Sequence, residues 1–284
     1  MKLPNIATEF EMYGLVALDQ TEDLARMFGL DMAQTSSLNQ IESIQMLFGE
    51  NVAKYTSGLI LDPRSLLDVQ VETEQRPGLI FRLLQSPAQL TAQATILPNW
   101  GVEAIKNNYG LAYINLPYHP KEENSLVKKK FVAETFDFCQ YQGIDLILDL
   151  QLISPDGGKV HPENLLEVQL QAVQELRGFA DLLALDYPGS ALAAASITAE
   201  LDKPWIVSSR DQNYGQFKEE LRDSLASGAR GFLIGRSLWN EMGKLRREDQ
   251  SPDFDHIPEY IQTTVRDRVI ELTRIIDETA KKED

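Results

Sequence analysis

The sequence predicts a (β/α)8 barrel, also called a TIM barrel, formed by residues 1–284 as a single domain. Three observations favour this fold: eight short apolar runs, amphipathic stretches of helical length between them, and a final amphipathic stretch that can close the ring. Runs that are apolar on both faces and separated by helices are typical of a parallel sheet covered on both sides. Eight of them within about 230 residues suit a closed barrel.

Each apolar run ends near an Asp, Pro, Arg or Gly, as expected for buried strands that lead into polar loops. The spacing between successive runs is fairly even. The eight expected strands are Leu15–Gln20, Gly58–Pro63, Leu79–Gln85, Leu111–His119, Ile144–Ile153, Asp181–Pro188, Trp205–Arg210 and Gly231–Trp239.

Amphipathic stretches between these runs would connect parallel neighbours. The clearest are Ser37–Tyr55, Val102–Tyr109, Ser125–Gln142, Pro162–Gly178 and Tyr214–Gly228. The final segment spaces its apolar residues by four, four, three and four positions, which predicts a closing helix with one apolar stripe. The stripe consists of Ile261, Val265, Val269, Leu272 and Ile276.

An open, doubly wound sheet is the alternative architecture. It is disfavoured because the first run leads into TEDLARMFG rather than into a Gly-rich phosphate loop. No internal repeat, low-complexity tract or Pro/Gly/Ser linker divides the chain, so we expect one domain.

The chain is strongly acidic, with a formal net charge of −16 from 27 Lys and Arg and 43 Asp and Glu. Nucleic acids and anionic membranes bind through clustered Lys and Arg, so both are poor expectations for partners. An anionic small molecule remains a reasonable substrate if a local Arg cluster receives it. The composition leaves the oligomeric state open, a homo-oligomer included.

Cys139 is the one cysteine, so no intrachain disulfide can form, and we expect a buried thiol in a reducing compartment. The N-terminal residues MKLPNIATEFEM contain no apolar stretch of signal-peptide length and no small-residue cleavage site. The expected location is the cytoplasm. The run Lys128–Lys130 stands among acidic neighbours and is interpreted as a solvated turn.

Chemistry in this fold is placed at the C-terminal ends of the strands, because the loops there vary while side chains fill the barrel interior. The run ends therefore give the candidate site. Its catalytic candidates are Asp19, Asp149, Asp186 and His119, and its substrate-binding candidates are Gln20, Arg82, Tyr113, Asn115, Ser208, Ser209, Arg210, Gly235 and Arg236.

Several candidates also have structural interpretations. Asp62 precedes a proline and could end its strand by a side-chain turn, Arg82 could pair with a neighbouring carboxylate, and His119 could be a surface residue. Asp149 and Asp186 are harder to explain structurally, since each lies within an apolar run where an unpaired charge costs several kcal/mol.

Five stretches resemble the tagatose 1,6-bisphosphate aldolase family, a class I aldolase group that also includes sulfofructose-phosphate aldolases. The opening ALDQ-x3-L-x-x-MF and the closing GFLIGRSLW are fairly specific together, and the resemblance spans most of the chain. The stretches are ALDQTEDLARMF (17–28), LILDP (59–63), LPNWGVEAIKNNYGLAYINLPYHP (97–120), DLLALDYP (181–188) and ARGFLIGRSLW (229–239).

The resemblance implies a barrel that cleaves a ketose bisphosphate through a Schiff base to a strand-six lysine. A strand-four lysine, a strand-five glutamate and a strand-one aspartate would assist, while Ser and Arg on strands seven and eight would hold a phosphate. The matching acids are Asp19, with Gln20 beside it, and Asp149, which is one methylene shorter than glutamate. The matching phosphate ligands are Arg236 with Ser208 or Ser209.

Neither lysine is present at the matching positions. The strand-six position is occupied by Ala184 and the strand-four position by Tyr113, and no lysine lies within any of the eight runs. The nearest ones, Lys121, Lys159 and Lys203, lie in loops or before a strand. A solvated loop lysine stays protonated at neutral pH, whereas imine chemistry needs a free amine inside the site.

Three functions therefore remain open. The chain is an aldolase-like enzyme that acts on a phosphorylated or otherwise anionic ketose without a Schiff base, or an inactive homologue that serves as a sugar-phosphate sensor, or an enzyme with an unrelated reaction. No cofactor is expected, except that a divalent metal held by some of Asp19, Asp62, Asp149 and Asp186 could replace the imine as the electron sink.

Overall fold

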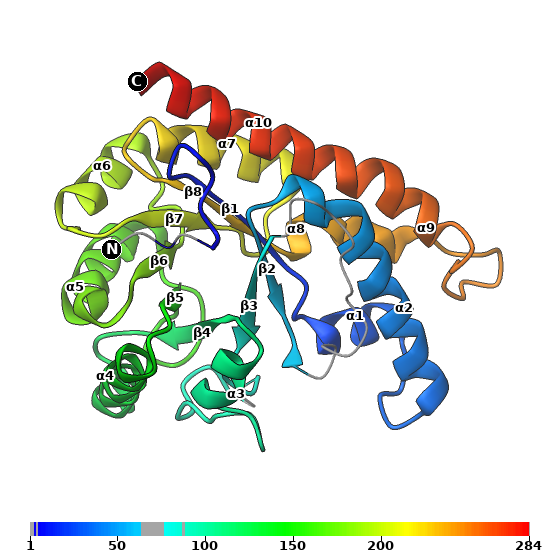
Figure 1. Cartoon of the computed structure of the whole chain (residues 1–284), viewed down its shortest axis with the longest axis horizontal. Coiled ribbons are helices and arrows are strands. Elements are labelled where there is room, and N and C mark those ends of the chain that lie inside the picture. The colour runs from blue at the N-terminus through cyan, green and yellow to red at the C-terminus, as the bar shows by residue number, and fades with distance from the viewer. Residues whose placement is uncertain (1–2, 4, 64–76, 87–88, 284) are drawn as a thin grey trace.

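Eight parallel strands pair in sequence order and close into a barrel, as the computed structural model of the chain shows (Figure 1). The structure describes all residues except 1–2, 4, 64–76, 87–88 and 284. Because the last strand pairs with the first, the (β/α)8 prediction is confirmed and the open-sheet alternative is wrong. The strands are β1 (Tyr13–Ala17), β2 (Gly58–Leu61), β3 (Gly78–Arg82), β4 (Leu111–Tyr118), β5 (Leu146–Leu152), β6 (Leu182–Leu185), β7 (Trp205–Ser208) and β8 (Gly231–Ile234).

Helices follow the strands and form the outer layer. The expected helix over Ser125–Gln142 has the bounds of α4, and three other expected stretches contain α3, α5 and α7. The stretch Ser37–Tyr55 overlaps α2, which begins two residues earlier. The α-helices are α1 (Thr21–Phe28), α2 (Thr35–Val52), α3 (Val102–Asn107), α4 (Ser125–Gln142), α5 (Leu165–Leu176), α6 (Ala191–Ala199), α7 (Tyr214–Leu225), α8 (Arg236–Trp239), α9 (Ile257–Tyr260) and α10 (Arg266–Glu283). None of the described helices is both long and apolar enough to cross a membrane.

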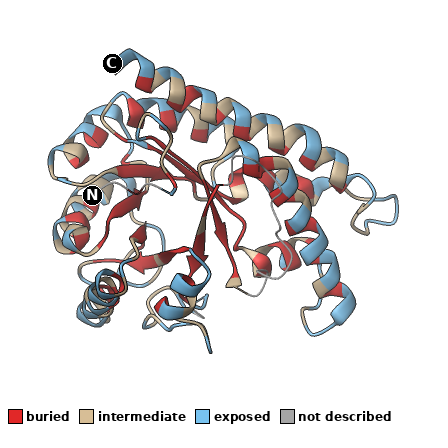
Figure 2. Ribbon diagram, viewed as in Figure 1, coloured by how far each residue is buried: buried red, intermediate tan, exposed pale blue. Residues whose placement is uncertain are grey.

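Successive residues of each strand face opposite sides, which gives the barrel two separate apolar layers. Figure 2 shows the strands as mostly buried ribbon. On β5, for example, Leu146, Leu148 and Leu150 pack outward against the helices, whereas Ile147 packs inside the barrel. Two residues along, Asp149 continues the inward row. The inward rows thus begin as hydrophobic packing and end in polar side chains at the carboxyl ends of the strands.

The closing helix forms as its apolar stripe predicts. The segment runs from α9 through a π-helical turn at Ile261–Val265 into α10, and the five stripe residues are buried. Arg268 of α10 donates to the backbone oxygen of Leu238 at 2.9 Å and forms an ion pair with Glu241. These contacts fix α8, which carries Arg236, against the outer layer.

Lys128 is not solvated, so the interpretation of Lys128–Lys130 as a solvated turn is wrong for its first residue. The side chain is 1% exposed and points inward from α4. Its ammonium group donates to the backbone oxygens of Pro117 at 2.7 Å and Leu90 at 2.8 Å, and it pairs with buried Glu122 at 2.9 Å. Burial lowers the pKa of Lys128, which Glu122 partly offsets. The lysine ties the loop after β3 to the end of β4.

Replacing Lys128 by Met should lower the free energy of unfolding by about 3–5 kcal/mol, because Glu122 would be left as an uncompensated buried charge. Methionine keeps the aliphatic length, so packing changes little. Denaturant unfolding followed by circular dichroism measures the loss. The matched control is Lys130→Met at a side chain that is 76% exposed, where we expect a change within about 0.5 kcal/mol. Equal effects at the two positions would contradict the buried role.

Candidate active site

The carboxyl ends of the strands bring most of the predicted site residues to one mouth of the barrel. The residues arrive there because each continues the inward row of its strand or stands in the loop that follows it. Inside the mouth lie Asp19 after β1, Asp62 after β2, Arg82 at the end of β3, Tyr113 and Asn115 on β4, Asp149 on β5, Asp186 after β6, Ser208 on β7 and Arg210 after β7.

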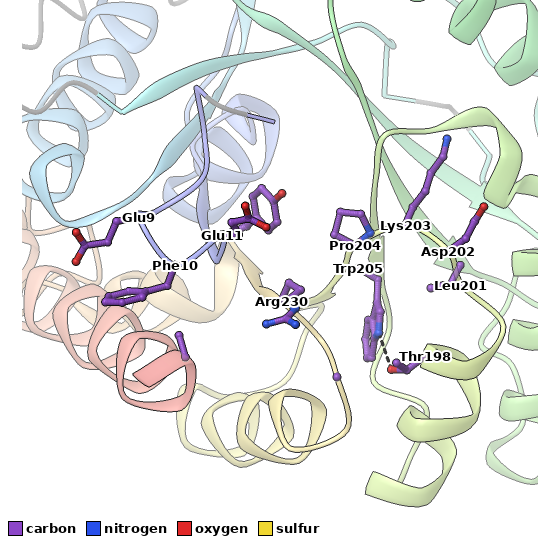
Figure 3. Close-up of a pocket in the computed structure, with 13 residues that line it drawn as sticks. Glu9, Phe10, Glu11, Thr198, Leu201, Asp202, Lys203, Pro204, Trp205 and Arg230 are labelled. Carbon is purple, nitrogen blue, oxygen red and sulfur yellow. Dashed lines mark hydrogen bonds between the residues drawn. The ribbon is translucent and has the colours of Figure 1, made fainter. Parts of the chain in front are cut away.

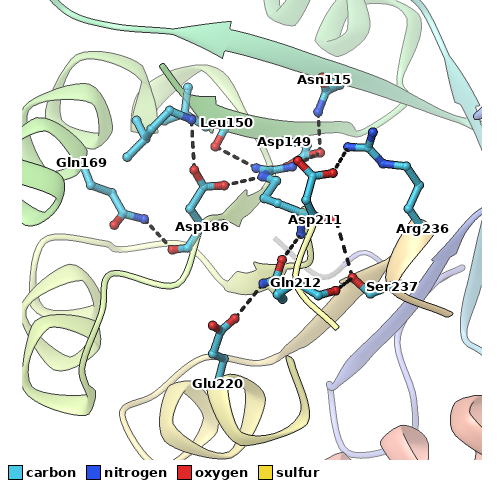
Figure 4. Close-up of polar contacts among 12 residues, drawn as sticks. Asn115, Asp149, Leu150, Gln169, Asp186, Asp211, Gln212, Glu220, Arg236 and Ser237 are labelled. Atoms are coloured by element: carbon cyan, nitrogen blue, oxygen red, sulfur yellow. Dashed lines mark hydrogen bonds and ion pairs between the residues drawn. The ribbon is translucent and has the colours of Figure 1, made fainter. Parts of the chain in front are cut away.

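Arg210 bridges the two carboxylates that stood out in the sequence (Figure 4). Its Nη1 and Nη2 atoms lie 3.0 and 2.8 Å from the two oxygens of Asp149, and its Nε donates to Asp186. Nη2 also donates to the backbone oxygen of Leu150 at 3.0 Å. The bidentate contact is the strongest geometry available to an Arg–carboxylate pair. One guanidinium thus neutralises charge on both β5 and β6.

The Asp149 carboxylate acts only as a hydrogen-bond acceptor. Tyr113 and Asn115 each donate to the same oxygen, Oδ2, at 2.7 Å. Burial acts to raise the pKa of Asp149, but the charge and hydrogen bonds of Arg210, together with those of Tyr113 and Asn115, lower it overall. Asp149 therefore stays ionised at neutral pH and is a poor proton carrier.

Tyr113 and Asp186 complete this network, and burial raises the pKa of both side chains. Burial and the neighbouring Asp149 raise the pKa of the Tyr113 phenol well above its usual value, so the phenol stays a neutral donor. Burial also raises the pKa of Asp186, although Arg210 and the backbone N–H of Leu152, 3.1 Å away, oppose the shift.

Asp19 is the acid in the mouth that can exchange a proton near neutral pH. Its residue is 6% exposed, and its side chain forms no hydrogen bond or ion pair with another described residue. Burial raises the pKa of Asp19 to about 7; Arg82 opposes the shift, and the charges of Asp62 and Asp149 reinforce it. A general acid or base works best when its pKa lies close to the working pH.

Asp62 and Arg82 form a second buried ion pair, with 2.5 Å between Oδ2 and Nη2. Thr21 donates to the same carboxylate at 3.4 Å, and Arg82 also contacts Ser86 at 3.1 Å. Arg82 therefore pairs with a neighbouring carboxylate, which was the structural interpretation of this residue. Its positive charge also acts to lower the pKa of Asp19.

The corner between β7, β8 and β1 contains polar atoms without partners. Among the described residues, Oγ of fully buried Ser208 and Oε1 of Gln20 are buried and form no hydrogen bond. The backbone N–H of Gly235 donates to Ser209 at 3.3 Å. A Cβ on Gly235 would lie 2.6 Å from Nε2 of Gln20, so only glycine lets that side chain approach. Unpartnered buried polar atoms indicate a place for a polar ligand.

Arg236 stands at the rim of this corner and is paired with two acids. It lies 3.3 Å from Asp23 of α1 and 3.0 Å from Asp211 (Figure 4). The sequence analysis placed Arg236 in a phosphate site but gave no role to either acid. Asp211 directly follows Arg210, so its position just after the seventh strand was the one feature of the sequence that could have indicated its place in the site.

His119 is not brought together with the carboxylates. It is 6% exposed rather than a surface residue. Its Nδ1 accepts from the backbone N–H of Lys121 at 2.9 Å, and the backbone N–H of His119 donates to the Glu122 carboxylate at 3.1 Å. Burial lowers the pKa of His119, and the charges that act on it are those of Glu122 and Lys121. A role as proton carrier for the Asp149 network stays a prediction without a contact to support it.

No three His, Cys, Asp or Glu side chains among the described residues come together as metal ligands would. Asp62 and Asp149 are each bonded to an arginine instead. The divalent-metal hypothesis stays a prediction, and these contacts offer it no ready ligand set.

Ala184 lies inside the barrel at the centre of the site. It belongs to the interior apolar cluster, and on β6 it pairs in register with Asp149 of β5 and Ile206 of β7. Its methyl group leaves space on the side of Asp149 that Arg210 approaches from the next strand. Cys139, by contrast, is fully buried on α4, as expected for a structural thiol.

A cavity of about 890 Å³ lies at the opposite end of the barrel (Figure 3). Its lining includes Glu9, Phe10, Lys203, Trp205 and Arg230, which precede strands or begin them. None of the predicted site residues lines it. Barrels of this fold place their active sites at the carboxyl ends of the strands, so the other mouth is the better candidate for the active site.

A closed parallel barrel with polar side chains gathered at its strand ends defines a protein of the (β/α)8 barrel class. Within that class, the chain belongs to the DeoC/LacD aldolase family, whose model matches residues 14–241. A tagatose 1,6-diphosphate aldolase of Staphylococcus aureus is 23% identical over 93% of this chain and 91% of its own length. The family resemblance noted in the sequence is thereby confirmed.

Solved structures show the same fold. An archaeal fructose 1,6-bisphosphate aldolase, with its catalytic lysine covalently bound to a carbinolamine intermediate, is 15% identical and superimposes with a TM-score of 0.63 over 97% of this chain and 98% of its own. A Corynebacterium glutamicum protein is 11% identical, with a TM-score of 0.68 over 96% of this chain and 88% of its own.

Asp19→Asn should stabilise the protein increasingly as pH rises. The pKa of Asp19 lies at about 7 in the folded chain, against 3.8 for an unperturbed aspartate. The folded state therefore binds more protons than the unfolded state between these values, and wild-type stability falls as pH rises through that window. Asparagine does not titrate, so the difference in unfolding free energy should grow from pH 4 to pH 7 and then level off. Urea unfolding across this pH range measures it, and a constant difference would contradict the assignment.

Proposed function

We propose that this chain binds and processes a phosphorylated ketose at the carboxyl-end mouth of the barrel, without forming a Schiff base. The single observation that carries the proposal is the inward position on β6 next to Asp149: it is occupied by Ala184, and the cation beside it is Arg210. Membership of an aldolase family supports the carbohydrate substrate.

Arg210 cannot act as the imine-forming nitrogen. Burial acts to lower the pKa of its guanidinium, but Asp149 and Asp186 raise it overall, so the group stays protonated. Lysines elsewhere do not supply the amine. Lys121 and Lys159 are exposed, Lys203 donates to the backbone oxygen of Ala180 at the far end of the barrel, and Lys128 is bonded to Glu122.

The remaining groups support acid–base catalysis with electrostatic stabilisation. In a cleavage of this kind, a base removes a proton from a substrate hydroxyl, the carbon–carbon bond breaks, and the electron pair moves toward the carbonyl oxygen. Asp19 has the pKa for the base, and it can return the proton to the enediolate that forms. Arg210 holds a fixed positive charge, and one of its Nη1 hydrogens has no partner among the described residues. Such a preorganised donor can stabilise the developing oxyanion.

The corner of Ser208, Ser209, Gly235 and Arg236 is the proposed phosphate site. Arg236 would exchange one of its acids for the phosphate, and Asp211 leaves readily because it is 60% exposed. The unpartnered oxygens of Ser208 and Gln20 would gain hydrogen bonds from a sugar phosphate or its hydration.

A sugar-phosphate sensor is the second candidate. It is favoured by the pairing of three arginines that the structure describes at the mouth, Arg82, Arg210 and Arg236, with carboxylates of the chain itself. A site arranged this way can recognise a ligand by exchanging ion pairs and needs no chemical step. Release of a triose phosphate from a ketose bisphosphate would favour the enzyme, whereas binding without turnover would favour the sensor.

Borohydride treatment in the presence of dihydroxyacetone phosphate should leave the mass of this protein unchanged, because none of the eight strands carries a lysine and the lysines described in the loops after β4 and β5 are exposed. Intact-mass spectrometry measures the result. The archaeal fructose 1,6-bisphosphate aldolase, whose lysine forms a covalent intermediate, is the positive control and should gain one reduced adduct. An adduct on a lysine of this chain would overturn the imine-free proposal.

Arg236→Ala should raise the Kd for a ketose bisphosphate about 10- to 100-fold, as expected when a hydrogen bond between charged groups worth about 1.5–3 kcal/mol is lost. Isothermal titration calorimetry measures the affinity. Arg222→Ala is the matched control, since Arg222 lies on α7 and is paired with Glu219 on the surface. If the two variants bind equally well, Arg236 does not hold the phosphate.

A further inference from the structure

Helix α4 presents an outer face with large apolar side chains that nothing among the described residues covers. Leu126 is 78% exposed, Val127 47%, Phe138 41% and Tyr141 82%. Figure 2 shows the outward side of this helix largely exposed, and Figure 1 locates α4 at the edge of the barrel. Apolar side chains gathered on one surface mark interaction sites more often than scattered ones do.

The exposed residues form one stripe along the helix. Leu126, Lys130, Asp137 and Tyr141 follow one another at steps of four, seven and four, which keeps them on one face. The opposite face, with Lys128, Val132, Thr135 and Cys139, is buried against the barrel. The stripe is therefore free of the intramolecular packing that occupies the rest of α4.

We propose that this face of α4 binds the same face of a second copy of the chain, with the two helices antiparallel about a two-fold axis. In a two-fold pairing each contact occurs twice, so the stripe must complement itself. The register that places Lys130 opposite Asp137 of the other copy also places Leu126 opposite Tyr141, because 130 + 137 and 126 + 141 give the same sum. The midpoint of the pairing then lies between residues 133 and 134.

Charge favours a second copy over an unrelated partner. On the exposed face, Lys130 lies in the first half of the helix, and Glu134 and Asp137 lie in the second half. A parallel arrangement would bring like charges together, whereas an antiparallel one brings unlike charges together, and this local attraction opposes the repulsion expected from a net charge of −16. Lys130 is only weakly engaged on its own helix, 3.6 Å from exposed Glu134, and Asp137 has no ion pair among the described residues.

Aromatic rings extend the apolar end of the stripe. The rings of Phe138 and Tyr141 stack, with their centroids 6.3 Å apart. Tyr109, at the end of α3, is 91% exposed, and the neighbouring Lys106 contacts Gln142 of α4 at 3.2 Å. Tyrosine and phenylalanine are enriched in protein interfaces, so this end of the stripe has the composition of an interface core.

Sedimentation equilibrium of the full chain tests the proposal. We expect a monomer–dimer equilibrium below about 100 µM, and at least a 10-fold rise in the dimer Kd for Leu126→Asp and for Tyr141→Asp. Leu192→Asp on α6 is the matched control, because Leu192 is 81% exposed and lies outside the stripe. It should leave the Kd unchanged. Unchanged thermal melting of each variant at low concentration shows that the fold is intact.

A charge exchange tests the register. Lys130→Glu and Asp137→Lys should each weaken the dimer about 5- to 10-fold by placing like charges opposite one another, and the double variant should restore it. A chain that stays monomeric at about 100 µM would overturn the proposal. So would a dimer that survives Leu126→Asp and Tyr141→Asp, or a double variant as weak as the single ones.

Discussion

The bridge from Arg210 to Asp149 and Asp186 is the interaction on which the candidate site depends. Two carboxylates inside a barrel mouth cannot both remain ionised without a cation, because burial penalises each charge and the two repel each other. Arg210 reaches from the end of β7 across the position of Ala184 and satisfies both. The small side chain on β6 and the long one after β7 therefore complement each other, and changing either would alter the charge balance of the whole mouth.

The contacts of Arg210 also give the acids of the mouth different protonation states. Asp149 is held ionised by four hydrogen bonds from three side chains and can only accept. No described side chain donates such a bond to Asp19, whose pKa lies at about 7. Separate environments that push the pKa values of neighbouring acids apart are how one site holds a fixed charge and a mobile proton together. The chemistry proposed for the site uses this separation, with Arg210 as the fixed charge opposite the proton carrier.

Local patterns in the sequence predicted the strands well, because burial on both faces leaves a continuous apolar run and its end marks the mouth of the barrel. They also showed that Asp149 and Asp186 needed partners. The partner itself, Arg210, lies 61 residues from Asp149, and only the closed barrel brings the two together. Lys128 was misinterpreted for the same reason: its neighbours in sequence are polar, but two of its three partners are backbone oxygens of β4 and of the loop after β3.

The ion pairs of the mouth also bear on how a phosphate could enter it. Displacing Asp62 from Arg82 would leave a fully buried carboxylate without its cation, which is strongly unfavourable. Displacing Asp211 from Arg236 returns an exposed carboxylate to water at little cost. Of these two arginines, Arg236 is therefore the one that can exchange its partner at little cost. In the proposed binding mode the phosphate would lie toward β8, and the reacting carbons would lie toward Asp19 and Arg210.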